Sequence, residues 1–401
     1  MTIETLMQTN FGAFQLQRFP HRKNEILRAW EAADVYLLDY LVENELPLKE
    51  SCVLILNDDF GGLSIPLSHF RPVVMTDSYL SVQGILVNAL NNGIDEDLIT
   101  ITNSLTPAET LVDEVADVVL IKLPKSLALL EDQLHRIRPV LNSSSVIIAA
   151  GMTKHIHMST MALFEKIVGP TKTSLAQKKS RLIFSQFDEA LVTAGSPYPK
   201  SFKLPYQLDD VDIEVINHAA VFSQDKLDLG ARFLLENLPV SEHYKTIVDL
   251  GCGNGVLGLL AAIKNPAAKI IFTDESYMAV ESSISNFVSV FDDTREAEFL
   301  QTDCLHGIED NSVSLVLCNP PFHQNNAIND NVAWQMFSES LLALAEQGEL
   351  WVIGNRHLAY HAKLKRLFGN CEIIASNKKF VIHKAVKNTN SKTGAVKETE
   401  T

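Results

Sequence analysis

Cysteine is scarce in this 401-residue sequence, which contains five cysteines and no CxxC pair. Disulfide frameworks and zinc sites need cysteines at short, repeated spacings, so the sequence excludes both as organising features. His155 and His157 form an HxH motif without an evident third ligand, and we expect no metal site. This use of cysteine is typical of a reduced compartment, and we expect a cytoplasmic protein.

Long apolar runs are also missing, because no stretch approaches 18 uninterrupted apolar residues. The first residues, MTIETLMQTNFGAF, lack the basic segment followed by an apolar one that marks a secretory signal. We therefore expect a soluble protein with no membrane partner. A monomer is a separate expectation, which does not follow from these absences. Apolar residues still make up 46% of the chain, enough for a core in each of two domains of about 200 residues.

Basic residues are fewer than acidic residues, 34 against 49, which gives a net charge of −15. Taken alone, this balance argues against a nucleic-acid partner. The distribution is uneven, however, since 151–200 holds seven basic and three acidic residues and 351–401 holds ten and three. Residues 251–350 hold three and fourteen. The basic segments are either solubilising lysines or two phosphate-facing patches on an acidic body.

The second half alternates apolar, β-branched runs with segments of helical spacing, such as 332–346. This alternation predicts a mostly parallel sheet covered by helices. Only Asn377 and Lys378 separate the last two runs, and so short a connection allows only an antiparallel hairpin. The predicted strands are TIVDL (246–250), KIIFTD (269–274), EFLQTD (298–303), SVSLVLCN (312–319), ELWVIGN (349–355), CEIIAS (371–376) and KFVIHKAV (379–386).

The first half repeats this scheme, including a late hairpin between TKTSLA and SRLIFSQF. Three landmarks overlay at offsets of 194–197: VLILNDDFGGLS on IVDLGCGNGVLG, Thr76-Asp77 on Thr273-Asp274, and IKLPK on LCNPP. Such ordered self-similarity indicates a duplicated domain. We predict an α/β fold of two tandem Rossmann-like domains, 1–195 and 206–388, each with a seven-stranded, mostly parallel sheet ending in an antiparallel hairpin. Residues 389–401 are predicted to be a disordered tail.

A glycine-rich turn, DLGCGNG (249–255), lies where a buried strand ends and a helix begins. Glycines there let the backbone approach a ligand closely. A dinucleotide fingerprint would need a third glycine at position 256, which is Val256. The turn instead resembles the cofactor loop of S-adenosylmethionine-dependent methyltransferases. That resemblance implies cofactor contacts by Gly251, Gly253 and Gly255, by Asp249 near the methionine end, by Asp274 at the ribose hydroxyls and by Asp303 at the adenine amino group.

Asn319-Pro320-Pro321-Phe322 follows the fourth strand of the second half. The plain interpretation is a rigid proline turn, but beside the glycine loop it resembles the NPP[FY] signature of methyltransferases that act on planar amino groups. A conjugated amino nitrogen has a poorly available lone pair. The Asn319 side-chain oxygen and the Pro320 carbonyl could accept its two N–H groups and orient it. Phe322 would stack on the base, and His323 could touch the target nucleotide.

The segment FSQDKLDLG (222–230) is interpreted first as a helix N-terminus capped by Ser223 or Asp225. It also resembles the F-S-x-D-x-L-D-x-G segment of ribosomal RNA guanine-N2 methyltransferases. In those enzymes the segment lines the cleft for cofactor and target base. The resemblance therefore implies that Asp228 contacts the cofactor and Phe222 the substrate.

From about residue 12 to 388 the chain resembles bacterial 23S ribosomal RNA guanine-N2 methyltransferases of the RlmG type. The segments that carry this resemblance are FSQDKLDLGARF, CNPPFHQ, NVAWQMF, LQRFP and AWEAAD. This implies one methyl transfer from S-adenosylmethionine to the N2 of a guanine in 23S RNA. In the first half Asn57 and Asp59 replace the loop glycines and Leu123 replaces Asn319, which predicts a degenerate domain that docks RNA. The residues predicted to contact opened or single-stranded RNA are Lys178, Lys179, Arg181 and, in the second half, Arg356.

Two other functions remain open at this point. The NPPF motif also fits enzymes that methylate a glutamine in a translation factor or an adenine in DNA. A non-catalytic RNA-binding assembly module with vestigial sites in both halves is the third possibility. The hypothesis of a non-catalytic module is disfavoured because the predicted site residues are all intact, namely Asp249, Asp274, Asp303 and Asn319.

Overall fold

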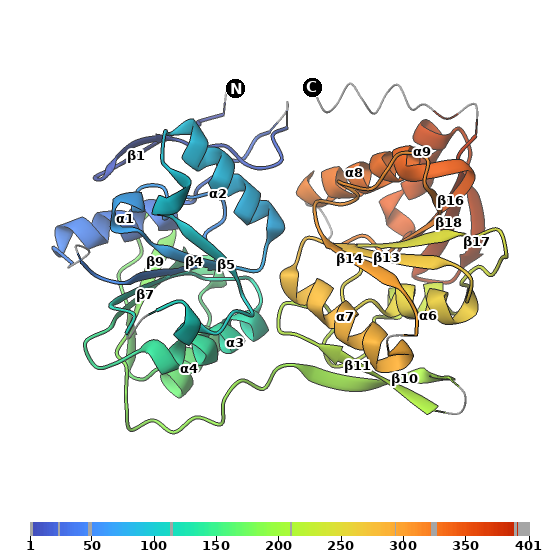
Figure 1. Cartoon of the computed structure of the whole chain (residues 1–401). Coiled ribbons are helices and arrows are strands. Elements are labelled where there is room, and N and C mark those ends of the chain that lie inside the picture. Colours follow the sequence, from blue (N-terminus) through green and yellow to red (C-terminus); the bar gives the residue numbers. More distant parts are fainter. Residues whose placement is uncertain are drawn as a thin grey trace. The chain divides into compact units, whose positions relative to one another are not determined.

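The computed structural model describes residues 3–22, 25–46, 50–112, 115–208, 211–292, 294–321, 327–388 and 391. The chain divides into two compact units, Met1–Tyr198 and Pro199–Thr401 (Figure 1). Apart from Ser391, the predicted tail lies outside the described residues, as do Phe322 and His323 of the second unit.

The second unit is built on a seven-stranded sheet in the order β14-β13-β12-β15-β16-β18-β17. The first five strands pair in parallel, and β18 runs antiparallel to both of its neighbours. The predicted parallel sheet with a terminal hairpin is therefore confirmed. The strands are β12 (Thr246–Leu250), β13 (Lys269–Asp274), β14 (Ala297–Gln301), β15 (Val313–Cys318), β16 (Leu344–Asn355), β17 (Glu372–Ser376) and β18 (Phe380–Val386).

Helices cover both faces of this sheet because its central strands are apolar on both sides. Ile247 of β12 packs into one core cluster with α5, α6 and α7, whereas Val248 packs into the other with α8 and α9. Figure 1 shows α6 and α7 on one side of the sheet and α8 and α9 on the other. The helices are α5 (Leu229–Leu235), α6 (Val256–Lys264), α7 (Tyr277–Phe291), α8 (Ala327–Ala343) and α9 (Tyr360–Phe368).

The boundary between α8 and β16 differs from the sequence prediction by several residues, more than the shifts of one or two residues at the other strands of this sheet. We expected a helix over 332–346 and a strand from 349, but α8 ends at Ala343 and β16 begins at Leu344. Leu344 pairs with Val313, and the register then shifts before Glu349 pairs with Leu315. The polar stretch inside this irregularity disguises the start of the strand.

The first unit repeats the strand order of the second, as β5-β4-β3-β6-β7-β9-β8, with the same parallel core and antiparallel end. This identity of topology confirms the predicted repeat. The strands are β3 (Val53–Leu56), β4 (Val73–Thr76), β5 (Thr100–Asn103), β6 (Val118–Lys122), β7 (Val146–Met152), β8 (Thr171–Thr173) and β9 (Ser180–Ser185). The helices are α1 (Ala32–Glu43), α2 (Tyr79–Asn91), α3 (Leu127–Ile137) and α4 (Met158–Ile167).

Each unit also carries a two-stranded antiparallel hairpin outside its main sheet. In the first unit β1 (Leu6–Thr9) pairs with β2 (Gly12–Gln15). In the second, β10 (Lys200–Leu208) pairs with β11 (Val211–Asn217). Short 3-10 helices lie at Ser68–Phe70, Glu96–Leu98, Ala108–Thr110, Arg138–Val140, Thr153–His155 and Arg356–Leu358.

Candidate active site

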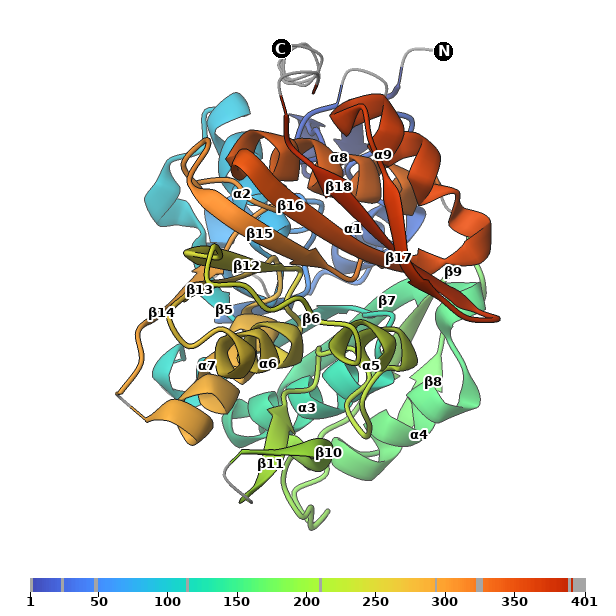
Figure 2. The ribbon, with the colours of Figure 1, turned by 90° about the vertical axis from the view of Figure 1, so that its right-hand side faces the viewer.

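The candidate site lies at the carboxyl edge of the second sheet. β12, β13, β14, β15 and β16 are parallel, so the segments that follow them emerge at the same edge (Figure 2). The chain leaves β12 toward β13 on one side and returns to β15 on the other, which makes the end of β12 a topological switch point. Open α/β sheets place their ligands in the crevice at such a point.

The glycine loop after β12 needs glycine for two different physical reasons. Gly251 and Gly253 have φ values of 69° and 56°, in the left-handed region that favours glycine. A Cβ atom built on Gly253 would meet no atom of the described residues within 4 Å, so this point of the backbone is accessible to a ligand. Gly255, with φ of 75°, precedes α6, and a Cβ there would lie 2.6 Å from Cβ of Ser283. Gly251 is close to the Met336 side chain, with 3.2 Å from a built Cβ to Met336 Cε, so the open point of the loop is Gly253, and Gly255 allows close packing.

Asp274 at the end of β13 holds this loop in place. Its Oδ2 accepts the Gly253 N–H at 2.9 Å, and its Oδ1 accepts the Ser276 N–H at 2.9 Å. Burial raises the pKa of the Asp274 carboxyl above its ordinary value, although these N–H groups oppose the shift. The carboxylate is half-buried, so it stands beside the open loop where the sequence analysis places a ribose contact.

Asp249 lies beneath the loop rather than on its surface. The side chain is fully buried, and its Oδ2 accepts the Gly258 N–H of α6 at 2.7 Å. Its Oδ1 has no hydrogen-bond partner among the residues that the structure describes. Burial raises the pKa of this carboxyl to about 8. Asp249 therefore braces α6 from inside the core, and its contact with a cofactor stays a prediction.

Asp303, just after β14, is tied to α8 by a pair of residues that the sequence analysis missed. Gln335 Nε2 donates to Asp303 Oδ2 at 2.9 Å and to Glu339 Oε1 at 2.8 Å. Glu339 Oε2 in turn accepts the Leu305 N–H at 2.8 Å. The sequence signal that could have indicated this pair is the i,i+4 spacing of Gln335 and Glu339 within NVAWQMFSE, which places both side chains on one face of a helix. This arrangement fixes the Asp303 carboxylate at the sheet edge.

Asn319 and Pro320 follow β15 at the same edge. The Asn319 Oδ1 atom is buried and has no hydrogen-bond partner within the described part of the chain. A buried amide oxygen without a partner costs free energy, so it is a candidate acceptor for a ligand donor. The predicted roles of Phe322 and His323 fall on residues outside the described ranges and stay predictions.

The segment before α5 corrects one expectation. The helix is capped by Asp228, whose Oδ2 accepts the Ala231 N–H at 2.9 Å, not by Ser223 or Asp225. Ser223 has a φ of 60° and donates its hydroxyl to the Lys226 carbonyl, and Asp225 pairs with a lysine. The cap uses one Asp228 oxygen, and the cofactor role of this residue stays a prediction. Phe222 is 70% exposed, as a substrate contact requires.

The predicted RNA-contacting cations lie in both units. Arg356 follows β16 at the sheet edge, where its Nη1 donates to the Asn377 carbonyl at 3.0 Å. Lys178 and Lys179 are exposed in the turn between β8 and β9 of the first unit. Arg181 is half-buried in β9, and its Nε is buried with no hydrogen-bond partner among the described residues. Their RNA contacts stay predictions.

The corresponding loop of the first unit is filled by its own side chains. Asn57 keeps the left-handed conformation of Gly251, with φ of 60°, and exchanges amide hydrogen bonds with Gln133 at 2.8 and 2.6 Å. Lys122 Nζ lies 2.9 Å from Asp34 Oδ2 and 3.1 Å from Asp59 Oδ2. Burial opposes the Lys122 charge, but these aspartates dominate and raise the pKa of the ammonium. A hydrogen-bonded, charged cluster thus occupies the space that the second unit leaves open.

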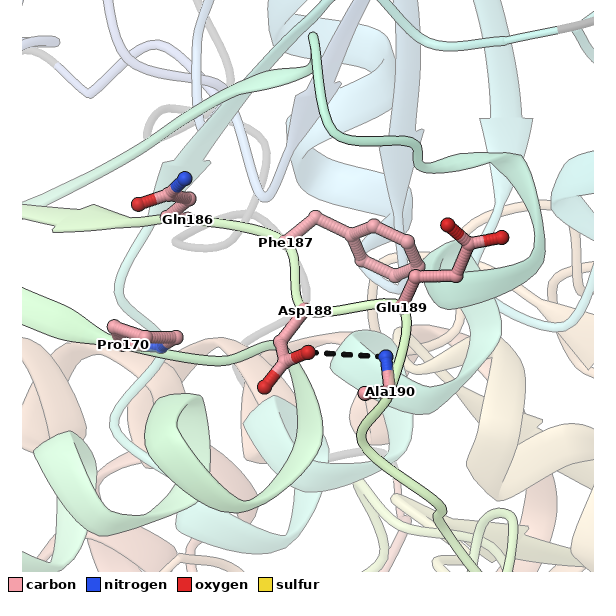
Figure 3. Close-up of a pocket in the computed structure, with 6 residues that line it drawn as sticks. All are labelled: Pro170, Gln186, Phe187, Asp188, Glu189 and Ala190. Atoms are coloured by element: carbon pink, nitrogen blue, oxygen red, sulfur yellow. Dashed lines mark hydrogen bonds between the residues drawn. The ribbon is translucent and has the colours of Figure 1, made fainter.

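Other features of the described residues do not add to this site. The hollow in Figure 3 lies after β9 in the first unit, where the Asp188 carboxylate accepts the Ala190 N–H at 3.0 Å, and it contains none of the candidate residues. No group of three or more His, Cys, Asp or Glu in the described ranges is arranged to hold a metal ion. No described helix combines the length and apolarity needed to cross a bilayer.

This topology and glycine loop define a Rossmann-like methyltransferase. Family models described as "RLMG N-terminal domain" and "Methyltransferase small domain" match residues 4–189 and 212–384. Two similar relatives are named "Ribosomal RNA large subunit methyltransferase G", and each is 46% identical to this chain. The match to the protein of Streptomyces coelicolor covers 95% of this chain and 100% of the relative. The match to the protein of Pseudoalteromonas translucida covers 96% of this chain and 99% of the relative. The chain belongs to the ribosomal RNA large subunit methyltransferase G family.

A solved structure shares the two-unit fold. It is titled "T. Thermophilus 16S rRNA N2 G1207 methyltransferase (RsmC) in complex with AdoMet and Guanosine" and superposes with a TM-score of 0.74 at 17% identity. The match covers 96% of this chain and 98% of that one. At this identity the likeness establishes the shared fold, including the duplicated architecture.

Proposed function

We propose that this chain transfers a methyl group from S-adenosylmethionine to the exocyclic N2 of a guanine in 23S ribosomal RNA. The relatives of 44–47% identity carry names that specify large-subunit ribosomal RNA. The observation that carries the chemistry is the buried Oδ1 of Asn319, which has no hydrogen-bond partner among the described residues and lies beside the glycine loop. An acceptor held in that place suits an amino group as the methylated atom.

The residues present fit this cofactor. The loop bends through Gly251 and exposes its backbone at Gly253, Asp274 stands beside it to accept from ribose hydroxyls, and Asp303 is fixed to accept from the adenine amino group. When bound, S-adenosylmethionine supplies an electrophilic methyl group on a sulfonium. The protein positions these two carboxylates before binding, because each is already held by donors from the loop or from α8.

The Asn319 oxygen and the Pro320 carbonyl would accept the two N–H groups of guanine N2. This interaction orients the nitrogen lone pair and stabilises the positive charge that grows on nitrogen as the new bond forms. No strong general base is needed, because the methylated ammonium loses its proton readily. Phe322 would stack on the extruded base, and His323 and Phe222 would contact the target nucleotide.

We assign the two predicted domains different roles. Residues 206–388 hold the catalytic groups, whereas the filled loop of residues 1–195 leaves that domain to dock RNA through Lys178, Lys179 and Arg181. The target guanine must be accessible, so we propose an opened or single-stranded region as the substrate. The acidic remainder of the chain would disfavour wrongly placed RNA.

The proposed function is tested by identifying the product. Purified full-length protein is incubated with methyl-labelled S-adenosylmethionine and either 23S or 16S ribosomal RNA transcripts, and the RNA is digested to nucleosides. Labelled N2-methylguanosine from the 23S transcript alone would support the proposal. Label in DNA adenine or in a translation-factor glutamine, with none in either RNA, would replace it by the alternative amine or amide substrates.

A further inference from the structure

A groove at the carboxyl edge of the second unit is not used by the residues assigned so far. It lies between the start of α5 and the turn that joins β17 to β18. Phe380, the first residue of β18 after this turn, pairs with Asn355, the last residue of β16, so the groove opens at the same edge as the candidate active site. Its lining residues are Leu229, Arg232, Phe233, Glu236, Asn377, Lys378, Lys379 and Phe380.

The groove combines an apolar floor with an exposed apolar rim. Phe380 is buried and Phe233 is half-buried, and both pack against the core cluster beneath α5. Leu229 is 58% exposed, although it is a large aliphatic side chain. Phe222, seven residues earlier on the segment that enters α5, is 70% exposed. A large apolar side chain exposed at the rim of a hollow, as Leu229 is, indicates a contact surface.

The charge along the groove is positive. Lys378 and Lys379 are exposed, and Lys379 Nζ lies 4.9 Å from the centroid of the Phe380 ring. Arg356 stabilises this turn, because its backbone N–H donates to the Lys379 carbonyl at 3.1 Å. The one acidic lining residue, Glu236, is paired with Arg232 at 3.1 Å. The turn lysines are therefore not opposed by an unpaired acidic residue of the lining.

We propose that this groove binds the single-stranded RNA adjacent to the target guanine. A base would lie against Leu229 and Phe233, and the neighbouring phosphates would contact Lys378 and Lys379. Apolar surface interleaved with cations is the combination that binds single strands, since bases present apolar faces and the backbone presents charge. The inference rests on the proposed function and adds to it a substrate subsite within the catalytic unit.

The test compares steady-state methylation of the 23S transcript by full-length variants at several salt concentrations. For Lys378→Glu/Lys379→Glu we expect the RNA KM to rise about tenfold with kcat nearly unchanged. The slope of log KM against log salt should fall by about 1.4, since each phosphate contact with a single strand contributes about 0.7. For Leu229→Ser we expect a KM increase of about threefold without a change of slope, because a base contact releases no counterion.

The matched control is Lys245→Glu/Lys269→Glu, which changes the net charge of the same unit equally. Both control lysines are exposed; Lys245 precedes β12 and Lys269 is the first residue of β13, so both lie at the opposite edge of the sheet. If the wild type methylates the transcript but the groove variants match this control in KM and slope, the groove assignment is wrong and the proposed function stands. If the wild type forms no N2-methylguanosine, the proposed function itself fails.

A second measurement does not depend on any variant. Photocrosslinking of the full chain to 23S transcript containing 4-thiouridine should give adducts within residues 229–236 or 377–380. Adducts confined to other segments would overturn the proposal. Crosslinks lost on competition with an acidic peptide, at a peptide concentration that leaves total RNA binding intact, would reassign the groove to a protein partner.

Discussion

Asn319 carries the largest share of the chemical argument, because its oxygen is a buried acceptor without a described partner. For Asn319→Ala we expect kcat to fall on the order of 10²–10³-fold, as for the loss of one preorganised transition-state contact. Cofactor affinity should stay close to that of the wild type. Single-turnover kinetics and calorimetry measure the two quantities separately. A wild-type kcat in this variant would show that another group holds the target amine.

Ionisation of the Asp249 carboxyl should change how the free energy of unfolding depends on pH. Burial raises the pKa of its carboxyl to about 8, whereas an unfolded aspartate titrates near pH 4. Between these values the folded chain keeps a proton that the unfolded chain has lost, so the contribution of this group to stability is present below about pH 4 and declines as pH rises. Asp249→Asn cannot ionise and keeps an oxygen for the Gly258 N–H.

The free energy of unfolding of Asp249→Asn, relative to the wild type, should therefore increase from about pH 4 to about pH 8. The increase should not exceed about 1.4 kcal/mol per pH unit. Denaturant unfolding of both proteins across this range provides the measurement. A difference that stays constant with pH would mean that the Asp249 carboxyl ionises in the folded chain as an exposed one does.

At the scale of elements, α8 positions a cofactor-binding carboxylate. Without the Gln335 amide, Asp303 and Glu339 lose the donor that they share. We expect Gln335→Leu to weaken S-adenosylmethionine binding about tenfold or more, in line with roughly 1.5–3 kcal/mol for hydrogen bonds to charged groups. Calorimetry gives the affinity. Gln207→Leu, which removes an amide donor to Asp212 in the β10–β11 hairpin outside the main sheet, serves as the control, and equal losses in both variants would exclude a specific role for Gln335.

The helices and strands could largely be predicted from the sequence, but the side-chain hydrogen bonds that connect them could not. The strands could be predicted because they are apolar runs between turn residues. The two-residue connection at Asn377 and Lys378 allows only a hairpin. The α5 cap was assigned to the wrong residue because Ser, Asp and Asp all occur within six positions and all make good caps. The Gln335 contact joins α8 to the end of β14, 32 residues away, and no local pattern encodes such a distance.

At the scale of the whole molecule, the two units should differ in ligand binding. Titration of the full chain with S-adenosylmethionine should give one site, since Asn57, Asp59 and Lys122 fill the loop of the first unit. Isothermal calorimetry counts the sites directly. A stoichiometry of two would contradict the interpretation of the first unit as a domain without cofactor.

RNA binding should in turn depend on the first unit. Charge reversal at Lys178, Lys179 and Arg181 is expected to raise the dissociation constant for 23S RNA and to flatten its salt dependence, because fewer counterions are released. Cofactor affinity should not change. Filter binding at several salt concentrations provides the measurement, with Arg71→Glu, an exposed cation of the same unit outside the basic segment 151–200, as the control. An unchanged salt slope would remove the first unit from the RNA contact.

The charged cluster of the first unit makes the loss of a second reaction centre hard to reverse. Lys122 is buried, and the carboxylates that neutralise it come from α1 and from the loop itself. Restoring glycine at positions 57 and 59 would reopen the backbone but also remove Asp59, and the buried Lys122 ammonium would stay at the loop, held by Asp34. A path back to activity would therefore have to replace the lysine first, before any glycine could be of use.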